Sequence, residues 1–201
     1  MMFVIDLNKC VACDACVTSC MSANGTPPGI TRSKVLRKEV GEYPESRRMS
    51  LPMLCMQCQN PPCVPVCPTG ATFVGAEGLV EVNRDACIGC RACAQACPYG
   101  ARYFREDVDS YFEHEQTPLE ALGYKDFPKG VVDKCDFCKG NGRLGRGEDP
   151  ACVAACPTNA RIFGSREEMQ KLIVKTGAVR LREELGTQPL VYYIKQRRLG
   201  K

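Results

Sequence analysis

Histidine is almost absent from this sequence: the chain has 201 residues, and His114 is the one histidine among them. A Rieske centre needs two histidine ligands, so the sequence excludes that cofactor, and with it histidine-rich zinc and haem sites. Most nucleophile–base catalysis is excluded as well, because histidine is its usual base. His114 stands between two glutamates, and we expect it to be a solvated surface residue.

Long hydrophobic runs are missing too. No apolar stretch approaches the roughly 18 residues that a membrane-spanning helix needs. The first residues do not follow the pattern of a signal peptide, and no twin arginine precedes the first cysteine. We therefore expect a chain without a membrane span and without an export signal of its own.

The charge balance gives no support for nucleic-acid binding. The formal net charge is +4, with the cysteines counted as neutral. No basic stripe interleaved with aromatic residues is present.

Cysteine is abundant, with 16 residues in four tight groups. A chain of this length can bury a core without disulfides, and cysteines two or three residues apart rarely reach good disulfide geometry. Such spacing suits a shared metal. We call the groups quartets one to four; their members are Cys10, Cys13, Cys16 and Cys20; Cys55, Cys58, Cys63 and Cys67; Cys87, Cys90, Cys93 and Cys97; and Cys135, Cys138, Cys152 and Cys156.

Quartet three matches the bacterial ferredoxin run C-x2-C-x2-C-x3-C-P in full. Quartet one differs only in having Met21 in place of the proline, while quartets two and four carry longer loops between their second and third cysteines. The residues after the last cysteine repeat as well, in 67–71, 97–101 and 156–160. Two-residue gaps let a loop bring three thiolates to one cluster. The fourth cysteine lies about one helical turn further on, and it ligates the other cluster of a pair.

Structural zinc is the alternative from another class, because paired C-x2-C motifs also make zinc sites. Quartet four alone would fit either metal. Zinc knuckles do not explain the ferredoxin run of quartet three, so the pattern favours iron–sulfur clusters.

The spacing of the quartets predicts an α+β fold made of two bacterial-ferredoxin-like two-cluster units, one inserted in the other. Residues 53–104 form the inserted unit with quartets two and three, and the segment 70–82 within it predicts two short strands about a glycine turn. Residues 1–52 plus 130–201 form the outer unit with quartets one and four. Residues 105–129 are predicted to connect the two units, with a short helix near 119–124 and a possible partner contact in their acidic, aromatic sequence.

The C-terminal part predicts a helix from Ser165 onward. Ser165 fits the N-cap and Glu168 follows three residues later, which is a capping box. Met169, Leu172 and Ile173 form an apolar stripe that we expect to pack on the core. The basic end 195–201 is predicted to be a solvated tail.

Taken together, these motifs make the chain resemble the four-cluster electron-transfer (beta) subunits of molybdopterin oxidoreductases of the dimethylsulfoxide-reductase family. It is most similar to those of polysulfide, thiosulfate and respiratory arsenate reductases. The resemblance rests on the quartets and on the segments 3–10, 41–44, 58–63 and 185–193.

The resemblance implies how the quartets share their clusters: three cysteines come from one quartet and the last cysteine from its partner quartet. Some relatives have tryptophan at the position of Cys90 and hold a three-iron cluster there, so this chain is expected to hold four [4Fe–4S] clusters. The implied ligand sets are Cys10, Cys13, Cys16 and Cys156; Cys135, Cys138, Cys152 and Cys20; Cys55, Cys58, Cys63 and Cys97; and Cys87, Cys90, Cys93 and Cys67.

The resemblance also implies a function. The chain is expected to have no catalytic residues and to pass single electrons between a molybdopterin (molybdenum or tungsten) catalytic subunit and a quinone-reactive membrane anchor or another carrier. The equivalent subunit of a formate dehydrogenase or hydrogenase complex is an alternative. Relatives without a signal are exported with a twin-arginine-tagged partner, so an extracytoplasmic location is expected, with the cytoplasm as the alternative.

Overall fold

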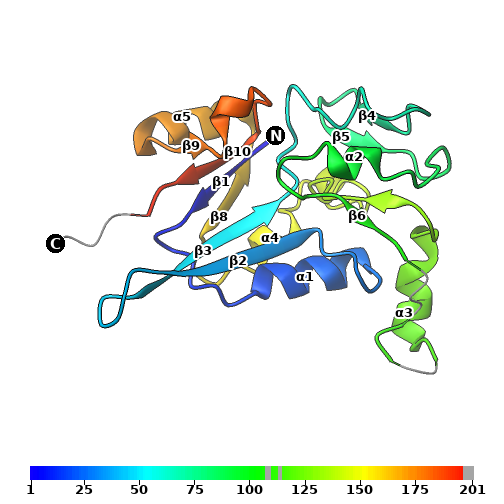
Figure 1. The fold of residues 1–201 in the computed structure, drawn as a ribbon, viewed down its shortest axis with the longest axis horizontal. Helices are drawn as coiled ribbons and strands as arrows, with labels where there is room; N and C mark the ends of the chain where they lie inside the picture. Colours follow the sequence, from blue (N-terminus) through cyan, green and yellow to red (C-terminus); the bar gives the residue numbers. More distant parts are fainter. Residues whose placement is uncertain (107–109, 113–114, 197–201) are drawn as a thin grey trace.

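The computed structural model describes residues 1–106, 110–112 and 115–196 of the chain (Figure 1). Short helices and strands are joined by long loops, and the largest sheet has the strand order β8-β1-β10-β9. His114 lies outside the described residues, and so does most of the basic tail.

The four-stranded sheet brings the two ends of the chain together. Strand β1 (Met2–Asp6) pairs in parallel with β10 (Val191–Ile194), so that Phe3 lies opposite Val191. On its other side β1 pairs antiparallel with β8 (Arg161–Gly164). The short strand β9 (Val179–Arg180) pairs with the outer edge of β10. The first and last segments of the sequence therefore share one sheet.

Strand β1 is buried on both faces, and alternation along the strand divides its side chains between two cores. Phe3 and Ile5 pack on one side in the core that also contains cysteines and Phe137. Met2 and Val4 pack on the other side. The rings of Phe3, Phe137 and Phe163 contact one another with centroids 4.8 to 5.6 Å apart. The sheet is thereby anchored directly to the loop of quartet four.

Helix α5 (Arg166–Thr176) confirms the predicted C-terminal helix and its cap. The Ser165 side chain accepts a hydrogen bond from the Glu168 amide, and the Glu168 side chain accepts one from the Ser165 amide. Met169 and Ile173 are buried in the second core and Leu172 packs against it, as predicted. The helix lies beside the four-stranded sheet (Figure 1).

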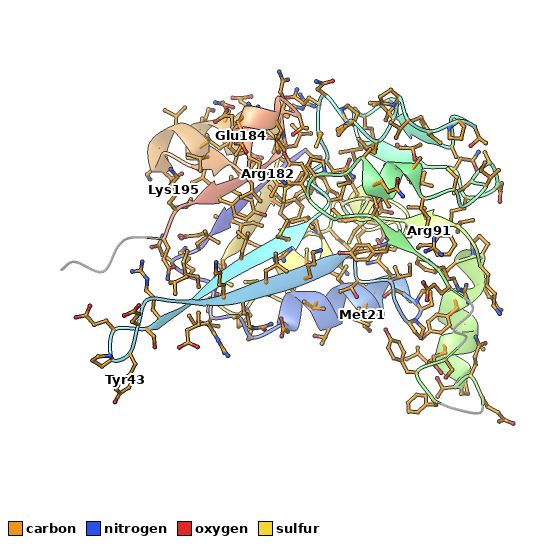
Figure 2. The ribbon with its side chains drawn as sticks, in the orientation of Figure 1. Met21, Tyr43, Arg91, Arg182, Glu184 and Lys195 are labelled. Atoms are coloured by element: carbon orange, nitrogen blue, oxygen red, sulfur yellow. The ribbon has the colours of Figure 1, made fainter. Side chains whose placement is uncertain are left out.

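Two hairpins lie outside that sheet. The predicted one is confirmed: β4 (Thr72–Val74) pairs antiparallel with β5 (Val80–Val82). The other, β2 (Ser33–Val40) with β3 (Arg47–Leu54), is longer and was not predicted. Tyr43 stands at its tip, away from the rest of the molecule, and is 93% exposed (Figure 2).

Three helices each carry the third cysteine of a quartet. The length of each helix depends on the residue that follows the fourth cysteine of that quartet. Helices α2 (Ala92–Gln95) and α4 (Ala151–Ala154) are single turns, each followed two residues later by Cys-Pro. Proline lacks an amide and cannot continue a helix. In quartet one, Met21 takes the place of that proline, and α1 (Ala15–Asn24) continues past Cys20 for another turn.

The segment after quartet three confirms the predicted short helix, α3 (Pro118–Gly123), which projects from the body of the molecule (Figure 1). Thr117 and Glu120 cap it reciprocally. Of its aromatic residues, Tyr111 and Phe112 are exposed, whereas Tyr124 and Phe127 are buried. Of the four, only Tyr111 and Phe112 therefore belong to the exposed surface of the segment.

The remaining elements connect these parts. Strand β6 (Tyr103–Phe104) pairs antiparallel with β7 (Val132–Asp133), and single 3₁₀ turns occupy Tyr124–Asp126, Leu144–Arg146 and Glu183–Leu185. No helix within the described ranges is long and apolar enough to cross a membrane.

Candidate metal centres

The cysteines gather into four groups that each mix two quartets. Burial raises the pKa of Cys58 to about 12, and the nearby thiols of Cys55, Cys63 and Cys97 add to this effect. A second group, Cys67, Cys87, Cys90 and Cys93, lines a small cavity.

The cysteines of quartets one and four gather in the same way. Burial raises the pKa of Cys20 to about 12, and its neighbouring thiols are Cys152 and Cys138 rather than those of its own quartet. Burial also raises the pKa of Cys10, whose neighbouring thiols include Cys156. In both pairs of quartets, the fourth cysteine of one quartet lies near cysteines of the other.

Such raised pKa values mean that the buried thiols stay protonated unless a positive centre holds their negative charge. Thiolate is the form that ligates metal, so binding would release protons and stabilise the fold. All 16 cysteines are free. The exposed ones are Cys13 and Cys90, the second cysteines of quartets one and three.

One backbone conformation recurs in all four quartets. The residue before the second cysteine has a positive φ each time: Ala12 at 55°, Gln57 at 46°, Gly89 at 70° and Phe137 at 58°. Residues other than glycine rarely adopt this conformation, and it costs of order 1 kcal/mol or more. Four independent loops holding it at the same position indicate that each loop is shaped around the same kind of ligand.

At Gly89 the close approach of another loop adds a second requirement. A Cβ atom there would lie 2.0 Å from the carbonyl oxygen of Gly130. Glycine at this position thus allows both the turn of quartet three and the contact with the start of the quartet-four segment.

A second conformation recurs after the fourth cysteine of quartets two, three and four. The amide three residues beyond that cysteine donates to its carbonyl oxygen, from Gly70, Gly100 and Asn159. In two of these turns an amide also donates to the sulfur: Thr72 N to Cys67 Sγ at 3.4 Å and Ala160 N to Cys156 Sγ at 3.2 Å. Burial raises the pKa of the Cys67 and Cys156 thiols, but hydrogen bonds from backbone amides outweigh burial and lower both pKa values overall.

Two buried arginines stand among the thiols. Arg102 Nη2 donates to Cys63 Sγ at 3.0 Å. Arg161 Nη2 donates to Ser33 Oγ at 2.9 Å, while its buried Nη1 has no hydrogen-bond partner in the described part of the chain. Burial opposes the charge of Arg161, but the Cys152 and Cys16 thiols outweigh it and raise the arginine's pKa.

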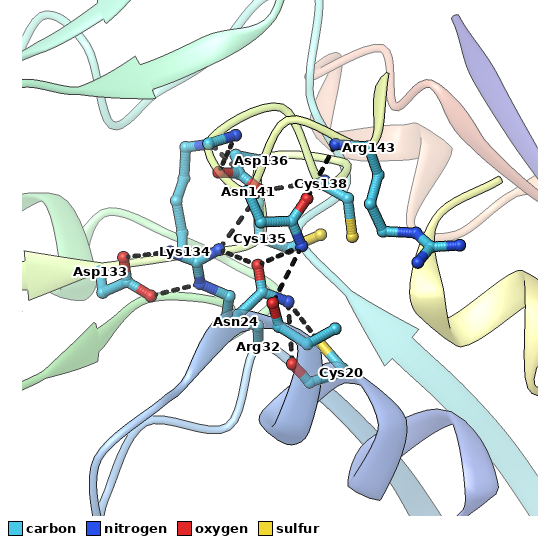
Figure 3. Close-up of polar contacts among 12 residues, drawn as sticks. Cys20, Asn24, Arg32, Asp133, Lys134, Cys135, Asp136, Cys138, Asn141 and Arg143 are labelled. Atoms are coloured by element: carbon cyan, nitrogen blue, oxygen red, sulfur yellow. Dashed lines mark hydrogen bonds and ion pairs between the residues drawn. The ribbon is translucent and has the colours of Figure 1, made fainter. Parts of the chain in front are cut away.

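A third buried arginine, Arg32, ties the end of α1 to quartet four (Figure 3). It binds Asp133 through two bonds, Nε to Oδ2 at 2.7 Å and Nη2 to Oδ1 at 2.9 Å, and its Nη1 donates to Asn24 Oδ1 at 3.0 Å. Asn24 in turn donates through Nδ2 to the Cys20 carbonyl oxygen at 2.8 Å. Burial opposes ionisation of Asp133, yet Arg32 and Arg84 lower its pKa.

Among the residues that the structure describes, no three histidine, cysteine or carboxylate side chains converge to hold a single metal ion. Buried thiols, amides aimed at sulfur and an unpaired buried guanidinium nitrogen together fit a larger iron–sulfur body.

Sequence analysis did not predict the arginines or Asp133. A signal for two of them is present, because Arg102 and Arg161 each stand five residues after the last cysteine of a quartet. The third member of that series is Thr72. Nothing local marks Arg32 or Asp133, which are a hundred residues apart and meet only in the folded chain.

Comparison with known proteins agrees with these centres. Two models described as "4Fe-4S dicluster domain" match the chain, one over residues 47–114 and the other over residues 86–160. The first range contains quartets two and three, and the second contains quartets three and four. These features define a ferredoxin-like iron–sulfur protein with four [4Fe–4S] clusters.

Relatives match nearly the whole sequence. The B subunit of selenate reductase from Mesobacillus selenatarsenatis is 40% identical over 95% of this protein and 70% of its own length. The B component of polysulfide reductase from Wolinella succinogenes is 37% identical over 97% and 94%, respectively. The arsenate respiratory reductase iron–sulfur subunit ArrB of a Shewanella species is 35% identical over 96% and 94%.

This chain is therefore a member of the family of iron–sulfur electron-transfer (beta) subunits of dimethylsulfoxide-reductase-family molybdopterin oxidoreductases. It is a non-catalytic subunit that transfers electrons for such a complex. The resemblance stated from its motifs is confirmed.

Proposed function

We propose that this chain passes electrons singly through its four clusters, between a molybdopterin catalytic subunit and a quinone-reactive membrane anchor or another carrier. The observation that carries the proposal is the fourfold repeat of one loop conformation beside four mixed groups of thiols. When bound, each cubane would accept and release one electron at a time.

The proposed ligand sets are the four implied by the resemblance. Their support is the grouping of the fourth cysteines: Cys97 lies near Cys58, Cys67 lines a cavity with quartet three, and Cys20 lies near Cys138 and Cys152. Cys156 lies near Cys10. In each case the fourth cysteine of one quartet lies near cysteines of the quartet with which it would share clusters.

The exposure of the cysteines supports an order of the clusters along the path of the electrons. The sets that contain Cys13 and Cys90 reach the surface, whereas the set of Cys135, Cys138, Cys152 and Cys20 is buried throughout. Tyr103 lies near cysteines of both inner sets. Burial raises its pKa, and the nearby Cys135, Cys55, Cys20 and Cys97 thiols raise it further. We propose that electrons enter and leave at the two surface sets and cross between the inner sets beside Tyr103.

We also propose the inserted arrangement of two ferredoxin-like units, with residues 1–52 and 130–201 around residues 53–104, joined by residues 105–129. The pairing of β1 with β8 within the outer unit supports it, as does the β4–β5 hairpin within the inner one. Strands β6 and β7 would be the seam between the units.

The catalytic partner is proposed to reduce a small inorganic electron acceptor, because the relatives named above belong to selenate, polysulfide and arsenate reductases. The partner contact is proposed to include Tyr111, Phe112, Leu119 and Leu122, which are exposed and line a groove beside α3. Aromatic side chains at exposed positions are typical of interface hot spots. An extracytoplasmic location, reached together with a tagged partner, is part of the same proposal.

Anoxic purification of the tagged protein from its own cells tests the proposal. A large subunit with molybdenum or tungsten should co-purify, and the acceptor of that subunit should reoxidise the reduced clusters within seconds. Fractionation of the same cells should find the complex outside the cytoplasm. A protein that carries clusters but purifies without a large subunit would contradict the proposed role.

A further inference from the structure

The position five residues after the last cysteine of a quartet holds different side chains in quartets two, three and four of the repeat. Five residues after the last cysteine stand Thr72 in quartet two, Arg102 in quartet three and Arg161 in quartet four. Each follows a buried alanine in the same turn. Two of these three equivalent positions therefore hold a cation where the third holds a neutral hydroxyl.

Arg102 is 8% exposed and has two contacts near cysteine ligands. Its Nη2 donates to Cys63 Sγ at 3.0 Å, and its Nη1 donates to Thr72 Oγ1 at 3.0 Å. The Thr72 amide donates to Cys67 Sγ. The guanidinium thus faces one thiol group directly and reaches the other through a threonine.

Arg161 holds the corresponding position in the outer pair and is 3% exposed. One side of its guanidinium is held by Ser33. The other side, Nη1, is buried without a hydrogen-bond partner among the described residues, and the Cys152 and Cys16 thiols are its charged neighbours. Thiols also surround Arg102: those of Cys63, Cys55 and Cys93 are the groups that raise its pKa most. Sulfur groups, rather than carboxylates, are therefore what each cation faces.

We propose that Arg102 and Arg161 are positioning residues that raise the reduction potential of one cluster in each pair: the cluster on Cys63 and the cluster on Cys152. The inference rests on the ligand sets of the proposed function. Reduction adds one negative charge to a cluster, and a buried cation hydrogen-bonded to its thiolate stabilises the added charge. Hydrogen bonds, net charge and burial are the means by which proteins set cluster potentials.

Redox titration of the four-cluster protein, followed by electron paramagnetic resonance, tests this. Arg102→Gln and Arg161→Gln should each make reduction of one cluster about tenfold less favourable, since a bond to a charged group is roughly that much stronger than a neutral one. Tenfold corresponds to about 59 mV for one electron. The two variants should lower two different midpoints, and Arg102→Lys should recover most of the first shift.

The matched control is Arg146→Gln, which removes an exposed arginine paired with Glu148. It should leave all four midpoints unchanged. Iron and sulfide content distinguishes a failure of the arginine role from a failure of the four-cluster assignment. Full cluster content with four unmoved midpoints in both glutamine variants would overturn this inference and leave the proposed function standing. Absence of clusters from the parent protein would overturn the proposed function itself.

Loss of a cluster from an Arg102 variant also tests whether the charge of this arginine matters. If Arg102→Gln and Arg102→Lys both lose the same cluster, the arginine is needed for its shape and not for its charge, and the inference is wrong. If the glutamine variant alone loses it, the lysine variant still reports the potential. A midpoint in Arg102→Lys equal to that of the parent would support the role of charge, and a midpoint lowered by about 59 mV or more would refute it.

Discussion

Replacing Asp133 by asparagine removes the negative charge at the centre of the Arg32 network while keeping the size of the side chain. Asp133 binds Arg32 through two bonds and also accepts from Arg84 Nη2 at 2.9 Å. The Arg32 and Asp133 side chains are 4% and 6% exposed. Removing one partner of a buried ion pair costs about 3–5 kcal/mol. Among the described residues, Arg32 would keep only its longer ion pair with Asp136, at 3.3 Å.

For a protein of this size, about 1 kcal/mol shifts the thermal midpoint by roughly 2–4 °C, so Asp133→Asn should lower it by about 6–20 °C. The pKa of Asp133 is lowered in the folded state, so its contribution is complete above the ordinary carboxyl pKa and is lost only as the pH falls below it. A measurement at pH 7 therefore sees the full effect. Anoxic heating followed by visible absorbance gives the midpoint, at one fixed scan rate because unfolding releases the clusters.

Glu148→Gln is the control for this prediction. At the surface, Glu148 accepts a hydrogen bond from Arg146 Nε at 2.6 Å and forms an ion pair with Arg143 Nη1 at 3.2 Å. Water screens exposed pairs, which therefore contribute little to stability, so the midpoint of Glu148→Gln should fall much less than that of Asp133→Asn. If Asp133→Asn loses no more than Glu148→Gln, the network does not hold α1 against quartet four.

Three further predictions concern the clusters and their surroundings. Cys90→Ser should convert one cubane to a three-iron cluster, seen as a new paramagnetic signal of the oxidised protein, because Cys87, Cys93 and Cys67 remain; four unchanged cubanes would show that Cys90 is not a ligand. Removal of iron with a chelator should abolish the cooperative thermal transition by circular dichroism, since the buried thiols lose the centre that holds them together; a retained transition would show that the sheet and α5 fold alone. The double variant Leu119→Glu, Leu122→Glu should keep its iron content but weaken co-purification of the catalytic subunit at least about tenfold. Leu36→Glu, on the β2–β3 hairpin, is the matched surface control. Equal recovery of the catalytic subunit with both variants would show that α3 is not part of the interface.

The parts of the fold that the sequence predicted are those with local signals. The capping box of α5, the hairpin 72–82 and the short helix near 119 each depend on residues within one or two turns of each other. The parallel pairing of β1 with β10 was not predicted, because Phe3 and Val191 meet only through tertiary structure. The β2–β3 hairpin was missed as well, since its strands are largely exposed and charged and lack clean alternation.

For the metal centres, spacing predicted which residues matter but not what surrounds them. The cysteine motifs repeat, so the ligands could be named from the sequence, and their division among clusters came from resemblance. The left-handed residue before each second cysteine is not visible in composition, since alanine, glutamine, glycine and phenylalanine all occupy it. The buried cations depend on contacts between distant segments, such as Arg102 with Cys63, and only the structure reveals them.

Metal and sulfide analysis of the anoxically purified protein tests the central claim most directly. Four cubanes predict about 16 iron and about 16 acid-labile sulfide per molecule, with a brown visible spectrum that bleaches on reduction. Iron near about 8 per molecule, as two cubanes would give, or zinc in place of iron, would contradict the four-cluster account.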